Sequence, residues 1–191
     1  MNYMTEGDVV GLGPIKKEHS KLWARWFNDL EVTQYLSTFH SIVTPEKEEA
    51  FYERVTDSDT DRVFSIYELD SDRPIGVCGL HQVDYSNRSG TLGIVIGKKD
   101  YWDRGYGSET ITLLLDYGFV VLSLHSINLT VREKNGRAKR TYEKVGFVSS
   151  GRLRDHWLRS GDFYDIEMMD ILRDEFYEVH DSVIERKYLQ T

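Results

Sequence analysis

The sequence predicts an α/β fold in which helices flank a mixed, mostly antiparallel central sheet. Residues 62–68, 74–83 and 91–96 are successive segments rich in strand-forming residues and joined by short turns, as expected of antiparallel neighbours. Residues 91–131 then read strand, glycine turn, helix, strand, which is a crossover unit and almost always makes its two strands parallel. We therefore expect one parallel strand pair inside an otherwise antiparallel sheet.

The amino-terminal part is predicted to contain one strand followed by three helices. Residues 9–15 form the strand, and the first helix follows residues 16–19, with apolar side chains at helical spacing at Leu22, Trp23, Trp26 and Phe27. A break at Asn28 and Asp29 separates it from a short helix over residues 30–36. Pro45 suits the first turn of a third helix over residues 46–55, because a missing N–H does no harm there.

The central strands are separated by turn sequences at residues 70–74 and 86–90. The last of these strands, residues 91–96, is apolar on both faces, which indicates a central position in the sheet. The helix after the glycine turn has residues at helical spacing along one face, which are Ile111, Leu114, Leu115, Gly118 and Leu122.

The carboxyl-terminal part is predicted to finish the sheet. We expect a strand at residues 127–131, a helix at residues 135–145, a strand around Phe147 and a hairpin over residues 157–171 that turns at 160–162. The tail, residues 173–189, mixes charge with apolar residues at helical spacing, and homodimerisation through this tail or an exposed sheet edge is a further expectation.

Length and composition predict a single domain over residues 1–191. Domains typically run about 100 to 200 residues, and no Pro- or Ser-rich run marks a linker. The first residues lack the basic and apolar pattern of a signal peptide, and no apolar run reaches the roughly 18 residues of a membrane span. We expect a cytoplasmic protein without a membrane partner.

Charge and cysteine content limit the possible partners. A formal net charge of −8 argues against nucleic acid, because phosphate contacts need a basic surface. The same charge would attract a cationic substrate, although solubility alone also explains an acidic composition. One cysteine, Cys78, excludes an intrachain disulfide and a thiolate-rich metal site, and the histidines lack ligand spacing, so no metal site is expected.

The glycine turn at residues 102–109 predicts an anion site. The first N–H groups of a helix lack internal partners and carry partial positive charge, and Gly105 and Gly107 let the backbone approach a phosphate. The turn lacks the third glycine of a dinucleotide fingerprint and the Gly-Lys-Ser/Thr of a P-loop. Ordinary turn chemistry remains an equally good explanation of this segment taken alone.

Asn135, Ala138 and Tyr142 form a second group. Residues three and seven apart lie on one face of a helix, so these three share a face. Asn135 is also a good N-cap and Tyr142 a plausible core aromatic, so structural roles alone account for both.

Several motifs in order resemble the GNAT superfamily of N-acetyltransferases. They are Ile94-Val95-Ile96-Gly97, the turn from Tyr101 to Glu109, Val131 to Ala138, and Tyr142-Glu143-Lys144-Val145-Gly146-Phe147. The sequence is most similar to the branch that contains the Rim-type ribosomal-protein N-terminal and the spermidine acetyltransferases. The resemblance covers nearly the whole chain.

The resemblance implies an enzyme that binds acetyl-CoA as a cosubstrate between a splayed pair of parallel strands. The pantetheine arm would contact the backbone of Ile94, Val95 and Ile96 and the side chain of Asn135. The pyrophosphate would bind the turn formed by Trp102, Asp103, Arg104, Gly105, Tyr106, Gly107 and Ser108. Tyr142 would act as the general acid that protonates the departing thiolate, and the backbone amide near Ile94 would stabilise the developing oxyanion.

The general base is where the sequence departs from that branch. Members often carry Glu where this chain has Thr91, whose hydroxyl cannot serve as a base. His81 or Asp84 could replace it through an ordered water. A primary alkyl amine of pKa about 10 is almost wholly charged at neutral pH, whereas about a tenth of an α-amine of pKa about 8 is neutral. A weak base therefore favours an α-amine acceptor.

The predicted function is direct acetyl transfer from acetyl-CoA to a protein or peptide N-terminal α-amine. Alternatives are acetylation of a small amine, such as a polyamine or an aminoglycoside, and a noncatalytic acyl-CoA-binding sensor. Acceptor selectivity is expected in residues 28–38 and 156–164, with pocket candidates at Glu31, Tyr35, His156 and Tyr164. Each of these four residues is equally compatible with an ordinary surface or packing role.

Overall fold

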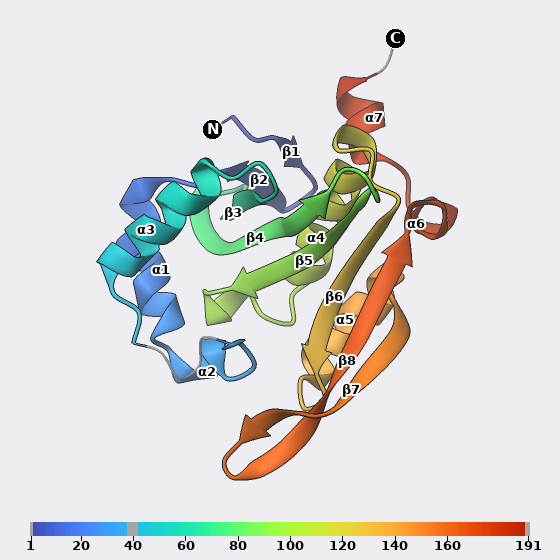
Figure 1. Cartoon of the computed structure of the whole chain (residues 1–191). Helices are drawn as coiled ribbons and strands as arrows, with labels where there is room; N and C mark the ends of the chain where they lie inside the picture. Colours follow the sequence, from blue (N-terminus) through green and yellow to red (C-terminus); the bar gives the residue numbers. More distant parts are fainter. Residues whose placement is uncertain (1, 38–41, 190–191) are drawn as a thin grey trace.

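The computed structural model describes residues 2–37 and 42–189 and contains an eight-stranded sheet in the order β1-β2-β3-β4-β5-β6-β8-β7 (Figure 1). The strands in chain order are β1 (Thr5–Glu6), β2 (Val10–Pro14), β3 (Arg62–Glu68), β4 (Arg73–Asp84), β5 (Ser89–Ile96), β6 (Ser126–Arg132), β7 (Val148–Arg159) and β8 (Asp162–Leu172). Within the described ranges, β5 and β6 are the single parallel pair. The predicted fold class is confirmed.

The parallel pair stays together for only part of its length. β5 pairs with β6 at Ser89–Ser126, Gly90–Ile127 and Thr91–Asn128, and then both strands continue without pairing. Each remains held on its outer side, β5 by β4 and β6 by β8. A gap therefore opens inside the sheet, closed at Thr91 and open at Ile96.

One face of the sheet is covered by α1 (Ser20–Phe27), which follows a 3-10 turn (Lys17–His19), and by α3 (Pro45–Thr56), with α2 (Leu30–Thr33) below them (Figure 1). Trp23 and Trp26 of α1 are buried. A side chain at Gly97 would collide with the Trp26 ring, because its Cβ would lie 2.1 Å from Trp26 Cδ2. The glycine that follows β5 thus lets α1 pack closely.

The opposite face carries α4 (Tyr106–Asp116), a π-helical turn (Tyr117–Val121) and α5 (Gly136–Val145). Successive strand residues point to opposite faces, and β3 shows both: Ser65 Oγ lies 3.4 Å from His19 Nδ1, whereas Phe64 packs edge-on against Tyr117 at 5.0 Å. The core on this side is formed mainly by α4 and the apolar strand residues. On the other face, Asn128 and Thr130 of β6 are exposed, so the β5–β6 gap is open to solvent there.

The tail forms two short helices, α6 (Arg173–Val179) and α7 (Val183–Tyr188), which a buried carboxylate attaches to α4. Asp116 is fully buried and accepts hydrogen bonds from the Tyr177 hydroxyl at 2.9 Å and from the Ile184 N–H at 2.8 Å. Burial and the bond to Asp116 raise the pKa of Tyr177, so its hydroxyl remains a donor. One side chain therefore holds both tail helices.

We expect Asp116→Ala to lower the free energy of unfolding by about 3 kcal/mol. The substitution leaves a buried hydroxyl and a buried N–H without their acceptor, and each such group costs about 1–3 kcal/mol. Urea unfolding followed by circular dichroism measures the change. Because Tyr177→Phe removes one of the two donors, the double variant should cost less than the sum of the single variants; strict additivity would contradict the proposed anchor.

A different anchor joins β2 to α4. Oε1 of Glu109 accepts hydrogen bonds from the N–H groups of Val9 and Val10 at 2.8 and 2.9 Å, and a Cβ at Gly7 would lie 2.4 Å from the same oxygen. Glu109 is thus used for structure and not for the anion site beside it.

Several boundaries differ from the sequence-based expectations. The helix expected over residues 30–36 ends at Thr33, and the tail is two helices because the chain is extended at His180. The strand around Phe147 and the expected hairpin are parts of two long strands, β7 and β8, whose pairing is interrupted by two bulges. Bulges shift the side-chain alternation, which hid the length of β7. β1 was not predicted.

No helix in the described part of the chain is both long and apolar enough to cross a bilayer. Cys78 is buried, and burial raises the pKa of its thiol.

Candidate active site

The glycine turn forms an open cradle at the start of α4. Gly105 is the N-cap residue with φ +90°, a left-handed conformation that glycine adopts without strain. A Cβ built at Gly105 would meet nothing within 4 Å, and one at Gly107 would meet only Thr141 Cγ2 at 3.9 Å. Backbone N–H groups at a helix N-terminus with free space before them fit an anion, such as the pyrophosphate of CoA.

Trp102 supports the cradle. Its Nε1 donates to the backbone oxygen of Ile96 at 2.8 Å, and the Arg137 guanidinium lies 3.8 Å from the centre of its ring. The indole therefore connects the end of β5 to the first turn of α5. Trp102, Asp103, Gly105, Gly107 and Ser108 all line a cavity of about 390 Å³.

Arg137, Arg140 and Lys144 of α5 line the same cavity beside the cradle. Three cations next to a helix N-terminus suit a ligand with several phosphates. The sequence-based reasoning missed them. The sequence did contain a signal for them: the three cations are spaced three and four residues apart on the helix that carries Asn135 and Tyr142.

Two predicted cradle residues point elsewhere. Tyr106 is buried and packs edge-on against Tyr101 at 4.8 Å, with its hydroxyl 3.5 Å from Glu68 Oε1. Arg104 donates to the backbone oxygen of Asp100 at 3.2 Å and does not line the cavity. Any contribution from Tyr106 or Arg104 to the anion site would come from the backbone.

Ile94, Val95 and Ile96 line the cavity on one side and Thr130, Val131 and Arg132 on the other, so the cavity occupies the gap between β5 and β6. The N–H of Gly97 donates to Ile75 on β4. Since hydrogen-bonded positions alternate along an antiparallel pair, the backbone groups of Val95 also face β4. Those of Ile94 and Ile96 face the gap, and the carbonyl of Ile96 already binds Trp102.

Asn135 and Tyr142 lie on the α5 side of the cavity together with Ala138. Asn135 is the N-cap of α5, and its Oδ1 accepts a 3.2 Å hydrogen bond from the Ala138 N–H. The structural role proposed for Asn135 from the sequence is therefore present, at the rim of the cavity.

Tyr142 is half-buried, packs edge-on against Phe147 at 5.8 Å, and lines the cavity. Desolvation raises its pKa to about 12. A phenol with a raised pKa keeps its proton at neutral pH, as a proton donor requires. α5 runs back along β6 from the open toward the closed end of the gap, so Tyr142 lies deeper than Asn135.

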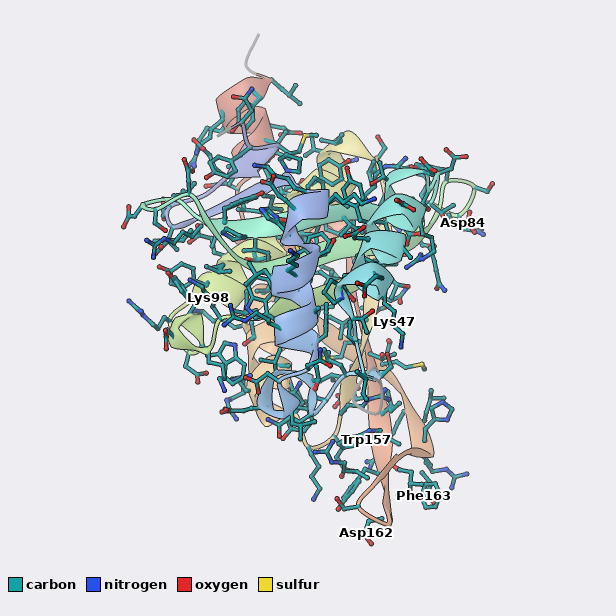
Figure 2. All side chains as sticks on the ribbon, turned by 90° about the vertical axis from the view of Figure 1, so that its left-hand side faces the viewer. Lys47, Asp84, Lys98, Trp157, Asp162 and Phe163 are labelled. Atoms are coloured by element: carbon teal, nitrogen blue, oxygen red, sulfur yellow. The ribbon has the colours of Figure 1, made fainter. Side chains whose placement is uncertain are left out.

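The cavity continues onto the α2 side of the sheet, where aromatic and cationic side chains gather. Tyr35 lines both the main cavity and an adjoining pocket formed with Gln34, Lys134, Trp157, Arg159 and Tyr164. The Trp157 ring lies 6.0 Å from Tyr35 and 5.7 Å from Tyr164. Figure 2 shows Trp157 on the arm formed by β7 and β8 that extends from the body.

Three cations surround these rings. Arg132 and Arg159 lie 5.8 and 6.0 Å from the centre of Trp157, and Lys134 lies 4.7 Å from the centre of Tyr164. Burial lowers the pKa of Arg132, but a guanidinium stays charged at neutral pH. We call Tyr35, Trp157, Tyr164 and the three cations the aromatic-cationic cluster.

Of the predicted pocket residues, Tyr35 and Tyr164 belong to this cluster. Glu31 lines the main cavity but is paired with Lys99 at 2.8 Å, and Asp29 binds the same ammonium at 2.9 Å. His156 lines neither pocket. Thr38 lies outside the described residues.

An anion cradle at a helix N-terminus, a gap in the sheet beside it and a tyrosine along that gap are the features that the resemblance implies for an acyl-CoA-dependent transferase. Comparison with known proteins agrees: a family model described as "Acetyltransferase (GNAT) domain" matches residues 10–148. The chain belongs to the GNAT acetyltransferase family. It is an N-acetyltransferase that uses acetyl-CoA, and the sensor alternative is set aside.

The similar proteins include several N-acetyltransferases. A spermidine N(1)-acetyltransferase of Vibrio cholerae is 30% identical over 131 residues, 69% of this chain and 74% of that protein. An uncharacterized N-acetyltransferase, p20, of Bacillus licheniformis is 27% identical and covers 86% of this chain and 93% of its own length. The solved spermidine N-acetyltransferase of Vibrio cholerae with CoA and spermine shares the fold, with a TM-score of 0.81 at 24% identity over 90% of this chain and 99% of that one.

Proposed function

We propose that the acceptor is the α-amine of a peptide or protein N-terminus and that acetyl transfer is direct. The observation that carries this proposal is the aromatic-cationic cluster on the acceptor side of the cavity. In a direct transfer the amine forms the C–N bond as the C–S bond breaks, and Tyr142 protonates the departing sulfur. The role of CoA is to supply an acetyl thioester, which an amine attacks more readily than an ester or amide.

The charges in the cavity support an acceptor that is not a polycation. Among the described residues lining the two pockets, the only carboxylates are Glu31 and Asp103. Glu31 shares the Lys99 ammonium with Asp29, and Asp103 lies in the cradle turn. A polyamine would meet the three cations Arg132, Lys134 and Arg159, and Glu31 would be the one carboxylate among these lining residues outside the cradle turn. A peptide, by contrast, offers carbonyls and acidic side chains to these cations and side chains to the aromatic rings.

Thr91 supports the same class of acceptor. Its hydroxyl donates to Asn128 Oδ1 at 3.1 Å, so it is engaged across the closed end of the gap. A weakly basic α-amine depends less on a strong base than an alkyl amine does, because more of it is neutral at pH 7.

Spermidine is the second candidate. The 30% identical relative from Vibrio cholerae carries that activity in its name, and the net charge of −8 attracts cations at long range.

The test measures release of CoA thiol with three acceptors: a peptide with Glu in second position, the same peptide with Lys there, and spermidine. We expect the highest kcat/KM for the Glu peptide and the lowest for spermidine. A higher kcat/KM for spermidine than for both peptides would overturn the proposal.

Lys134→Glu should reverse the order of the two peptides. We expect the ratio of their kcat/KM values to change about tenfold, equivalent to about 1.4 kcal/mol, because an exposed charge at this position acts through solvent. Lys21→Glu is the matched control: Lys21 is exposed on α1, away from both pockets, and the variant has the same net charge. An equal shift in Lys21→Glu would show a long-range effect and contradict the role of the cluster.

A further inference from the structure

A histidine and an aspartate lie at the closed end of the gap. His81 on β4 is the cross-strand partner of Thr91 on β5, and its ring extends over the next position on the same face, Gly93. A Cβ at Gly93 would lie 3.3 Å from both Cδ2 and Nε2 of His81. The ring therefore occupies space that the glycine leaves free, with Nε2 directed at the strand that carries Ile94.

Asp61 fixes the orientation of this ring. Nδ1 of His81 lies 2.7 Å from Asp61 Oδ1, and Oδ2 of Asp61 accepts from the Ser58 hydroxyl at 2.8 Å. Burial alone would raise the pKa of Asp61, but hydrogen bonds from Ser58 and His81 outweigh it and the pKa is lowered. An ionised carboxylate is only an acceptor, so Nδ1 is the donor and Nε2 is left free to accept a proton.

The position of this pair matches the reacting end of the cosubstrate. The phosphates bind at α4, which follows the end of β5 at Ile96, so an arm that enters the gap there runs toward Thr91. Ile94 is the deepest residue of β5 that lines the cavity, so the thioester lies near Ile94, beside Tyr142 on one face of the sheet. His81 lies on the other face and does not itself line the cavity, so a water is needed between its ring and the amine. His81 is about one-third exposed, on the face where Asn128 and Thr130 are also exposed.

We propose that Nε2 of His81 is the general base that accepts a proton from the acceptor amine, through a water, and that Asp61 positions it. The proposal rests on the acetyl transfer described above. The ammonium gives one proton to His81, and the neutral amine forms the C–N bond. A second amine proton, lost as the C–S bond breaks, replaces the one that Tyr142 gives to sulfur, and His81 releases its proton to solvent.

The other candidate base is used elsewhere. Oδ1 of Asp84 accepts from the N–H groups of Ser86 and Asn87 at 2.9 Å each, and Oδ2 accepts from Asn87 Nδ2 at 2.7 Å. Asp84 thus closes the β4–β5 turn. Figure 2 shows Asp84 far from Trp157, which belongs to the aromatic-cationic cluster.

His81→Gln should lower kcat/KM for the peptide acceptor about 100-fold at pH 7, the lower limit for losing a general base. The ratio of wild type to variant should shrink as the pH rises to 9, because an α-amine of pKa about 8 becomes neutral without help. Asp61→Asn should show the same trend with a smaller loss of kcat/KM.

Two arginines are the charged groups around the His81–Asp61 pair. Arg54 lies 3.8 Å from Asp61, and Arg62 donates to the backbone oxygens of Ser58 and Asp61.

The controls separate chemistry from folding. His125→Gln changes an exposed histidine outside the site and should match wild type. Acetyl-CoA affinity by calorimetry should be unchanged in His81→Gln. The proposal would be overturned if the ratio of kcat/KM between wild type and His81→Gln were constant across pH, or if His81→Gln were fully active.

The failure of the proposed acceptor would be seen separately. If wild-type protein acetylates spermidine and not peptides, the α-amine proposal fails, and His81 is tested with spermidine instead. The ratio of kcat/KM between wild type and His81→Gln should then stay large up to a higher pH, since a primary alkyl amine has a pKa of about 10.

Discussion

Tyr142→Phe is expected to lower kcat by about 100-fold or more while leaving acetyl-CoA affinity nearly unchanged. Removal of a positioned proton donor typically costs 10²–10⁴-fold, and the ring, its contact with Phe147 and its cavity surface are retained. The thiolate must then leave without a proton from the protein. Steady-state kinetics gives kcat, and calorimetry with acetyl-CoA gives the affinity.

Tyr188→Phe is the control for this variant. Tyr188 lies on α7 and is 51% exposed, so loss of its hydroxyl should change neither quantity. If Tyr142→Phe retained wild-type kcat, Tyr142 would be a packing residue of α5, as its contact with Phe147 alone would allow.

Gly107→Asp is expected to weaken CoA binding by about 100-fold. A carboxylate in the cradle would oppose the phosphates, and two like charges 4 Å apart near a protein surface repel by about 4 kcal/mol before screening by salt. The fold should tolerate the change, because a new Cβ meets only Thr141 Cγ2 at 3.9 Å and an acidic residue suits the first turn of a helix. Calorimetric titration with CoA measures the loss.

Gly107→Ala separates the added charge from the added volume. Its Cβ fits the same space, so most of the affinity should remain. Equal losses in the two variants would show that the cradle is limited by space, and unchanged affinity in Gly107→Asp would place the phosphates elsewhere.

The fold was predictable because its signals are local or nearly so. Alternating strand residues, turn sequences and the stripe through Ile111 identify elements, and the crossover rule then fixes which pair is parallel. The extent of β7 was not predictable in the same way. Its charged, exposed side chains and two bulges remove the alternation, and its length follows from pairing with β8.

The local backbone of the cradle turn was predictable from the sequence. Gly105 is identifiable because its φ of +90° is a conformation that few other residues adopt without strain. Tyr106 illustrates the limit: a tyrosine inside a predicted anion loop points into the core, since helix geometry decides its direction. The His81–Asp61 pair spans 20 residues, and no spacing rule brings them together. The hydrogen bond becomes visible only once β3 and β4 are paired.

The gap between β5 and β6 has a consequence for mutational robustness. Two strands with free inner edges would ordinarily invite another strand, but here β4 and β8 hold the outer sides of the pair and so fix the width of the gap. A ligand in such a slot meets backbone, which substitution of side chains leaves in place. We infer that exchange of Ile94 or Ile96 for another β-branched residue leaves the affinity for acetyl-CoA nearly unchanged.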